Sequence, residues 1–271
     1  QVNEELIAGN QFFGDEKSRD ELREFLNFDT RRVLLGEGAV YHLALECERL
    51  GARKVLLLRD AAIEQLEEPI RWTLNRAGVD LVDVFDHVIP NPTVQSVDEF
   101  AEKMRSVDCD AVIALGGGSS LDTAKVGLCT ATSGGSCADY FGFDLFSEPS
   151  QWPLIAMPTT AGTGAEVSRV SVVVAEEGKQ AVYSDYIQPT VAIVDPHFTR
   201  ELPPVLTAIT GLDAIGHALE CTASQKSNPI GDAIAREALA AGLPHFVAAV
   251  RKGSDDPEAR YQMTRCSLLA G

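Results

Sequence analysis

The sequence of 271 residues lacks several features that mark whole classes of protein. It has no run of about eighteen or more apolar residues, which is what a membrane-spanning helix requires. It also has no positively charged N-terminal segment followed by an apolar stretch and a small-residue cleavage site, so no secretory signal is visible. These absences lead us to expect a soluble, cytoplasmic protein that has no membrane partner.

Basic residues are scarce, because 23 Lys and Arg stand against 40 Asp and Glu, which gives a formal net charge of −17. An acidic chain repels a phosphate backbone, and no Lys/Arg cluster is interleaved with aromatic residues, so nucleic-acid binding is disfavoured. There are six cysteines but no CxxC pair, which argues against a disulfide framework and against a thiolate metal site. We expect these cysteines to be reduced, small core side chains.

Apolar strand-like runs alternate with amphipathic helical patterns from residue 28 to about residue 200. Such alternation with short connections predicts a parallel sheet with helices on both faces. Beyond residue 200 the strand signals stop, and we expect an N-terminal extension (1–27), an α/β domain (28–200) and the start of a helical domain (201–271). The expected strands are RRVLLG, 54–58, 81–88, 111–115, WPLIAMP, a hairpin around EEG and TVAIVD, with helices at 62–77, 94–106 and from 119.

The segment VIALGGGSSLDTAK (residues 112–125) runs from an apolar strand through three glycines into a helix. Glycine lets the backbone pass close to a ligand, and the first N–H groups of a helix are free, so this turn can bind a pyrophosphate. A plain strand-to-helix turn is the alternative, because the spacing is not the usual GxGxxG. Asp122, which we expect in the first helical turn, can equally cap the helix or answer its dipole.

Two polar residues follow the neighbouring strands. Asp60 comes after the strand at 54–58, where a carboxylate can accept from an adenosine ribose hydroxyl, although aspartate is also common in turns. Asn91 lies between two prolines in IPNPT (residues 89–93). Because the carboxyl ends of parallel strands meet at one edge of a sheet, we expect both residues to lie near the glycine turn, where open α/β sheets bind ligands.

Asp213 and His217 are four residues apart in TGLDAIGHALE (residues 210–220), so they share one face of a helix. A carboxylate and an imidazole at this spacing can supply two ligands to iron, zinc or manganese. An ordinary exposed pair is the alternative, and two ligands do not complete a site. Glu220 lies near the same face, either as an outer neighbour of a metal or as a solvated carboxylate.

Taken together and in order, these segments resemble the iron-containing (group III) alcohol dehydrogenases. The resemblance covers residues 28–271 and is specific because many separate motifs fall in register. It implies an N-terminal dinucleotide-binding α/β domain with a parallel sheet of the dehydroquinate synthase type, an all-helical C-terminal domain, and NAD(P) and a divalent metal in the cleft between them. The motifs are EGAV, Asp60, PNPT, GGGSSLDTAK, PTTAGTGAEVS, VAIVDP, LPP and TGLDAIGHALE.

The resemblance also implies roles for individual residues. Asp60 matches the position that favours NAD(H) over NADP(H), Asn91 matches a residue near the nicotinamide side, and Lys179 matches a lysine that reaches the nicotinamide ribose. Asp213 and His217 match the first two metal ligands, with Fe²⁺ the expected ion and Zn²⁺ the alternative. The other implied cofactor contacts are Gly117, Gly118 and Ser119 at the pyrophosphate, Asp122 nearby, and Thr159, Thr160, Thr163 and Ser168 in the threonine-rich loop.

In the family, two further ligands are histidines in a segment that follows the residues matching 270–271. We therefore expect the helical domain to be incomplete within 201–271 and to hold half of the implied metal site. The expected reaction is hydride transfer between NAD(H) and a small alcohol or aldehyde, with the metal as Lewis acid. By analogy, a homodimer is expected to form through a strand near residues 32–35.

Two alternatives to this function stay open. One is a metal-free reductase resembling the maleylacetate reductases, which has no need of the Asp213 and His217 pair. The other is a truncated nucleotide-binding chain without turnover.

Overall fold

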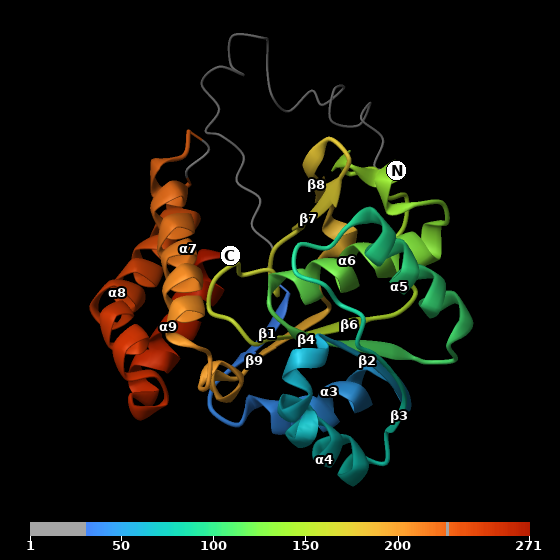
Figure 1. The fold of residues 1–271 in the computed structure, drawn as a ribbon, viewed down its shortest axis with the longest axis horizontal. Helices are drawn as coiled ribbons and strands as arrows, with labels where there is room; N and C mark the ends of the chain where they lie inside the picture. Colours follow the sequence, from blue (N-terminus) through green and yellow to red (C-terminus); the bar gives the residue numbers. More distant parts are fainter. Residues whose placement is uncertain (1–30, 226–227) are drawn as a thin grey trace, which may run out of the picture.

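A parallel sheet forms the centre of the computed structural model, which describes residues 31–225 and 228–271 (Figure 1). Within these residues the six-stranded sheet has the order β1-β9-β6-β4-β2-β3, and every neighbouring pair is parallel. The predicted parallel sheet is thereby confirmed. Its strands are β1 (Arg32–Leu35), β2 (Lys54–Arg59), β3 (Asp80–Phe85), β4 (Ala111–Gly116), β6 (Leu154–Pro158) and β9 (Val191–Val194).

Helices cover both faces of this sheet, which explains why its central strands are apolar without alternation. Along β2, Val55 and Leu57 join one core cluster, whereas Leu56 and Leu58 join the other. The first cluster packs against α3 (Leu43–Leu50) and α4 (Glu68–Ala77), and the second packs against α5 (Val94–Ser106) and α6 (Gly118–Ser133). The result is a three-layer α/β sandwich with the carboxyl ends of the strands open at one edge.

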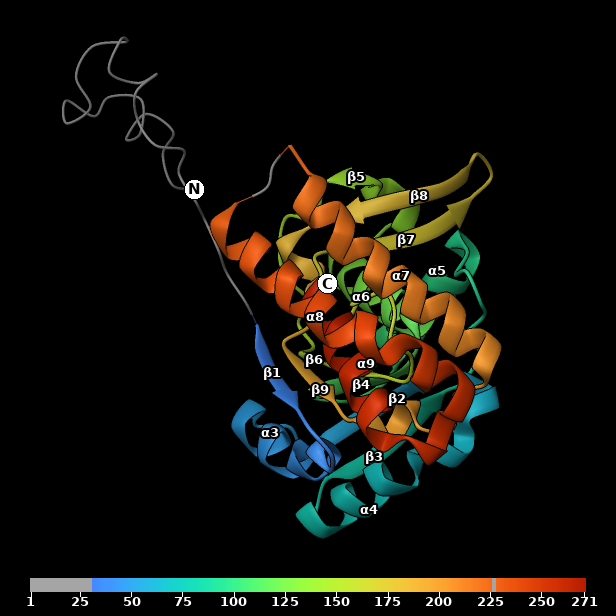
Figure 2. The same ribbon diagram turned by 90° about the vertical axis from the view of Figure 1, so that its left-hand side faces the viewer.

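A small second sheet lies over α5 and α6 (Figure 2). The hairpin expected around EEG is confirmed, since β7 (Val170–Ala175) and β8 (Gly178–Tyr183) pair antiparallel. The short β5 (Gly142–Phe143) pairs with the other edge of β8. Val173 and Val182 of the hairpin are buried against α5 and α6, so the hairpin is fixed to the helix that follows the glycine turn.

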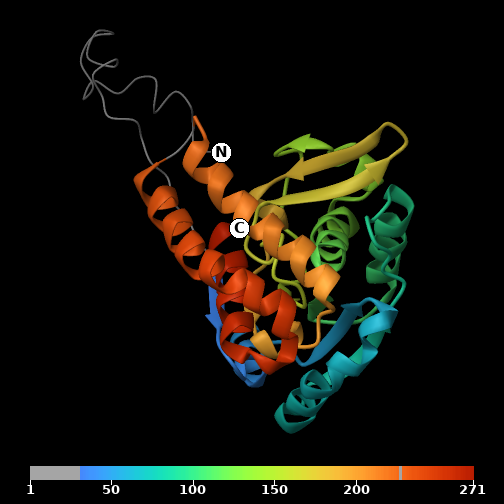
Figure 3. The same cartoon turned by 60° about the vertical axis from the view of Figure 1, so that its left-hand side comes forward.

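Beyond residue 203 the structure is helical, as the sequence predicts. Helices α7 (Pro204–Ala223), α8 (Pro229–Lys252) and α9 (Pro257–Ala270) pack against one another and stand beside the α/β part (Figure 3). Small side chains such as Ala214, Ala218 and Ala238 allow this close packing. By length and composition alone, residues Pro229–Asp255 would suit a membrane span, but α8 packs against both other helices here.

Two local expectations need correction. The third strand ends at Phe85 rather than at residue 88, because the chain turns away and His87 makes an isolated antiparallel bridge with Asp60. The helix expected at 62–77 divides into a 3-10 helix, η3 (Ala61–Glu67), and α4, with non-helical angles at Ile63. The remaining 3-10 helices are η2 (Ala39–His42), η4 (Cys137–Tyr140), η5 (Asp185–Ile187), η6 (Pro196–Thr199) and η7 (Gly253–Asp255).

All six cysteines lie in the described part of the chain and are free thiols, as expected. Five are buried and Cys221 on α7 is half-buried. Residues 1–27, which the sequence marks as an N-terminal extension, lie outside the described residues. The division into domains at residue 200 stays a prediction.

Candidate cofactor and metal site

One large cavity, of about 750 Å³, lies at the carboxyl edge of the sheet between the α/β part and the helices. The N-terminus of α6, the loop after β6, the β7–β8 hairpin, α7 and the end of α9 contribute to its walls. All thirteen sequence-predicted site residues fall in the described part of the chain, and nine of them line this cavity. These nine are Asn91, Gly118, Ser119, Asp122, Thr163, Ser168, Lys179, Asp213 and His217.

The order of the strands explains the position of the glycine turn. Strands β2 and β4 are neighbours, but the chain leaves β2 towards β3 on one side and leaves β4 towards β6 on the other. Their helices, α4 and α6, lie on opposite faces of the sheet. Such a point is where open α/β sheets bind ligands, because the two connections diverge and leave a crevice. Asp60 follows β2 and Gly117 follows β4, so both come directly after strands that end at this edge of the sheet.

The glycines of the turn are required partly by the protein itself. A Cβ at Gly117 would lie 3.2 Å from Cγ2 of Thr160, and a Cβ at Gly118 would lie 2.9 Å from Cγ2 of Thr163. The threonine-rich loop therefore packs directly on the glycine turn. This packing explains why Thr160 and Gly117 do not line the cavity, although Thr163 does.

Thr159 is also removed from the cavity wall. Thr159 is buried, at 5% exposed, and its backbone N–H donates to Gly116 O at 3.0 Å. The structure thus gives Thr159 a place in the join between β6 and β4. A direct contact between its hydroxyl and a cofactor stays a prediction from the sequence.

Ser119 joins the glycine turn to the asparagine loop. The N–H of Asn91 donates to Ser119 Oγ at 3.0 Å, and Asn91 adopts a left-handed φ of 56°, which asparagine tolerates better than most residues. The two loops after β3 and β4 are therefore fixed relative to each other before any ligand binds.

Asp60 does not line the large cavity but lies at the end of the adjacent strand. Its Oδ1 accepts from the N–H of Ala62 at 2.8 Å, so it caps η3, which is the turn role considered above. The preceding side chain, Arg59, is buried and pairs with Glu67 at 2.8 Å. One carboxylate oxygen of Asp60 is thus used locally, and its contact with a ribose stays a prediction.

Asp122 is not a helix cap, so that interpretation is wrong. The N-cap of α6 is Gly117, without a side-chain capping bond, and Asp122 Oδ2 instead accepts from the N–H of Val172 at 3.1 Å. This contact fixes the hairpin to α6. Burial raises the pKa of the Asp122 carboxyl, while Lys125 and the N–H of Val172 act in the opposite direction.

Sequence reasoning missed Lys125, one helical turn after Asp122. The residue is 1% exposed, and its ammonium donates to Ala165 O, Ser168 Oγ and Val170 O at 3.0, 3.2 and 2.6 Å. Glu166 is also buried, and burial raises its pKa to about 7. A Lys three residues after Asp on an otherwise uncharged helix is the signal that could have identified the pair Asp122 and Lys125.

The opposite wall carries Asp213 and His217 on α7. Asp213 Oδ1 lies 3.7 Å from His217 Nε2, and the two side chains are 45% and 39% exposed. The carboxylate and the imidazole face the same cavity and fit two positions of a divalent metal. Among residues 31–225 and 228–271, no group of three or more His, Cys, Asp or Glu could hold a metal, so the described residues do not complete the coordination.

Two glycines of the threonine-rich loop let the helical part approach. A Cβ at Gly162 would lie 2.7 Å from Cβ of Thr210 on α7, and a Cβ at Gly164 would collide with the backbone of Gly271 after α9. Gly164 also has a left-handed φ of 61°. The loop PTTAGTGAEVS therefore contacts the glycine turn on one side and the helices on the other, and it joins the two walls of the cavity.

Two models of known protein families match this chain. The family model described as "Iron-containing alcohol dehydrogenase" matches residues 30–196, and the model described as "Fe-containing alcohol dehydrogenase family, C-terminal" matches residues 207–271. The chain belongs to the iron-containing alcohol dehydrogenase family. This membership confirms the resemblance on which the sequence interpretation rests.

Individual members of the family show how far the similarity extends. A choline dehydrogenase of Bacillus subtilis is 36% identical over 260 residues, which cover 93% of this chain and 64% of the relative. An NAD-dependent methanol dehydrogenase of Bacillus methanolicus is 36% identical over 242 residues, covering 88% of this chain and 63% of the relative. The chain thus spans just under two thirds of the length of these relatives.

A solved structure supports the same fold. The sulfoacetaldehyde reductase of Bifidobacterium kashiwanohense, determined in complex with NAD⁺, superposes with a TM-score of 0.82 at 32% identity. The match covers 92% of this chain and 66% of that structure. The α/β domain followed by a helical region is therefore the family architecture.

Proposed function

We propose that this protein is an oxidoreductase that transfers a hydride between NAD(H) and a small alcohol or aldehyde with the help of a divalent metal, Fe²⁺ in preference to Zn²⁺. The observation that carries the proposal is that one cavity has the glycine turn of α6 on one wall and Asp213 with His217 on the other. The names of the relatives support the substrate class, since they include dehydrogenases of choline and methanol.

The α6 wall would bind and orient the dinucleotide. The first N–H groups of α6, at Gly118 and Ser119, have no partner within the helix and lie at its positive end, which suits a pyrophosphate. Asp60, at the end of the neighbouring strand, would accept from the adenosine ribose and disfavour a 2′-phosphate. Thr163 and Lys179 offer donors at the other end of the cavity, where we place the nicotinamide ribose, and Ser168, whose hydroxyl donates to Val170 O, would act there as an acceptor.

The α7 wall would hold the metal. Asp213 and His217 provide a hard oxygen and a borderline nitrogen ligand, which suits Fe²⁺ or Zn²⁺. When bound, NAD⁺ accepts the hydride and the metal acts as a Lewis acid on the substrate oxygen. The apolar residues Val172 and Val174 on the hairpin wall limit water at the cavity.

Three further features belong to the proposal. β1 is an edge strand of the sheet, paired only with β9 in the described residues, and an unpaired edge invites a homodimer through this strand. We also propose that the protein acts in the cytoplasm. Finally, we propose the domain boundary near residue 200, between β9 and α7.

Binding and turnover of the purified protein test this function. We expect NADH to bind with enhanced fluorescence, and NADPH to bind at least ten times more weakly, because the Asp60 carboxylate repels a 2′-phosphate. Aldehyde-dependent NADH oxidation should require added Fe²⁺ or Zn²⁺. Turnover without metal would favour the metal-free reductase, and NADH binding without any turnover would favour a nucleotide-binding chain. Failure to bind NADH at all would refute all three interpretations.

A further inference from the structure

Helix α6 carries a buried cation whose hydrogen bonds all end in the wall of the large cavity. The three protons of the Lys125 ammonium match three acceptors: Ala165 O, Ser168 Oγ and Val170 O. These acceptors are 40 to 45 residues away in sequence, and all three residues line the cavity. Lys125 itself does not line that cavity in the described structure, so it acts from behind the wall.

Asp122 adds a second hydrogen bond between α6 and the hairpin, beside those of Lys125. It lies one turn earlier on α6 and accepts from the N–H of Val172, two residues after Val170. Together the two side chains fix the end of the threonine-rich loop and the start of β7 to one face of α6. β8 is paired with β7, with Val174 opposite Lys179, so the position of Lys179 depends on the same attachment.

The energetic cost of this arrangement indicates that it serves a geometric purpose. Burying an ammonium costs several kcal/mol by desolvation, and an apolar side chain of similar volume often gives equal or better stability. Burial accordingly lowers the pKa of Lys125 to about 8, against the opposing influence of the carboxyl groups of Asp122 and Glu166. An apolar side chain at this position could fill the space but could not hold three acceptors at fixed points.

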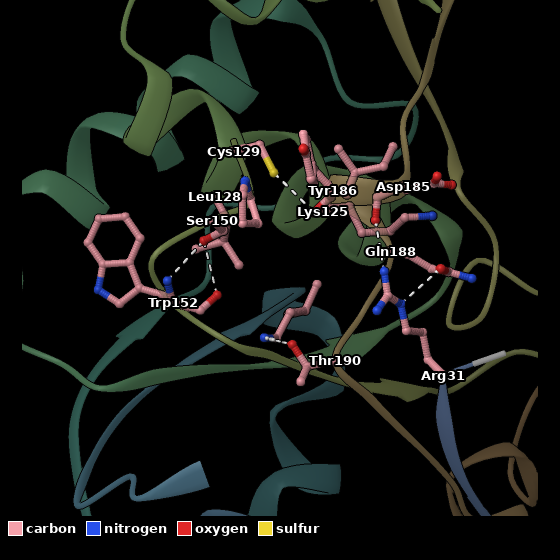
Figure 4. Close-up of a pocket in the computed structure, with 13 residues that line it drawn as sticks. Arg31, Lys125, Leu128, Cys129, Ser150, Trp152, Asp185, Tyr186, Gln188 and Thr190 are labelled. Carbon is pink, nitrogen blue, oxygen red and sulfur yellow. Dashed lines mark hydrogen bonds between the residues drawn. The ribbon is translucent and has the colours of Figure 1, made fainter. Parts of the chain in front are cut away.

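Behind Lys125 lies a second cavity of about 160 Å³ (Figure 4). Its polar groups pair locally: Arg31 donates to Gln188, and Cys129 Sγ contacts Tyr186 O at 3.3 Å. We assign no ligand to it. This cavity adjoins the Lys125 side chain, so a small molecule could enter the space left when that side chain is shortened. It therefore makes a chemical-rescue experiment feasible.

We propose that Lys125 is a positioning residue of the cofactor site, whose ammonium holds residues 165–170 in place as the part of the cavity wall, next to Thr163, that the dinucleotide contacts. The proposal rests on the proposed function in that the large cavity binds NAD(H). The positioning itself is a property of the free protein and can be measured without a ligand.

Chemical rescue provides the sharpest test. The Lys125→Ala variant lacks a propylammonium group, so we expect the dissociation constant of NADH to rise about tenfold or more and to recover in part when propylammonium is added. Tetramethylammonium, a cation that cannot donate hydrogen bonds, should give no recovery. If both cations or neither changed NADH affinity, the positioning role would be refuted.

Hydrogen exchange of the free protein gives a second readout, and Lys125→Met covers the case in which Lys125→Ala does not fold. We expect faster amide exchange in peptides covering residues 163–172 of Lys125→Met and unchanged exchange in the six-stranded sheet. The control is Arg260→Met, since Arg260, at 4% exposed, is another buried cation but donates to Thr207 Oγ1 and Leu202 O, away from the loop. Unchanged exchange at 163–172 would overturn the inference. Fast local exchange in a protein whose wild type does not bind NADH would support it while overturning the proposed function.

Discussion

The two walls of the large cavity are built in different ways. On the α6 wall, Asp122 is half-buried and Lys125, behind it, is buried, and both are hydrogen-bonded to the threonine-rich loop or to the hairpin. On the α7 wall, Asp213 and His217 are 45% and 39% exposed and lie 3.7 Å from each other. Folding alone fixes the first wall, whereas the second keeps its polar groups available to a ligand.

Because polar groups are more buried on the α6 wall than on the α7 wall, the two walls should contribute differently to fold stability and to ligand binding. A buried group that loses its partner destabilises the fold, because the remaining partner is left unsatisfied. An exposed ion pair contributes little to stability, because both groups are solvated when apart. Substitutions on the α6 wall should therefore change the free energy of unfolding, and substitutions on the α7 wall should change only what the cavity binds.

Glu166→Gln is expected to have the largest effect on stability, through pH. Burial raises the pKa of Glu166 from 4.5 to about 7, so the folded chain holds this proton more tightly than the unfolded chain. Its contribution to the free energy of unfolding therefore falls as pH rises from 4.5 to about 7, by roughly 3 kcal/mol at about 1.4 kcal/mol per pH unit. Urea unfolding across this range should show that loss in wild type and not in the variant.

The exposed Glu176, in the hairpin turn, provides the control for this experiment. The Glu176→Gln variant should keep the wild-type dependence on pH. A Glu166→Gln variant that followed the wild-type curve would show that Glu166 does not bind its proton more tightly in the folded state.

Asp122→Ala should come next. Removing the carboxylate leaves the half-buried N–H of Val172 without its acceptor, which costs up to about 1–3 kcal/mol. Asp122→Asn retains an amide oxygen and avoids a buried charge, so it should lose less. Thermal unfolding measures both variants, and an equal loss in the two would contradict the role of the hydrogen bond.

Gly164→Ala tests the contact that joins the two walls. The left-handed backbone costs an L-residue about 1–2 kcal/mol, and the new Cβ would collide with Gly271. We expect a lower midpoint of thermal unfolding. Gly216→Ala is the matched control, because it lies inside α7 with nothing within 4 Å and should raise the midpoint.

Asp213→Ala and His217→Ala should have the smallest effect on stability, within about 0.5 kcal/mol of wild type. Both should nevertheless abolish the binding of Fe²⁺ or Zn²⁺, as measured by calorimetry on the purified protein. If either variant unfolded much more readily than wild type, the two walls would not differ as described. If metal still bound to both variants, the proposed α7 ligands would be wrong.

Local chemistry explains why some of the site could be predicted from the sequence. The glycines at 116–118 after an apolar strand, and the four-residue spacing of Asp213 and His217, each require only the geometry of one strand or one helix. The resemblance to the family added Thr163, Ser168 and Lys179, which line the cavity. Asp122 also lines the cavity, but the capping interpretation failed because its hydrogen-bond partner, Val172, is 50 residues away.

By itself, the sequence determined the alternation of strands and helices, the glycine turn and the helical C-terminal region, because periodicity and backbone freedom are local properties. Only the tertiary structure decided which long-range contacts form. The Lys125 ammonium donates to Val170 O, Thr160 packs on Gly117, and Gly164 contacts the backbone of Gly271. These contacts join segments 40 or more residues apart. Their existence depends on how the strands are ordered in the sheet, which no short stretch of sequence encodes.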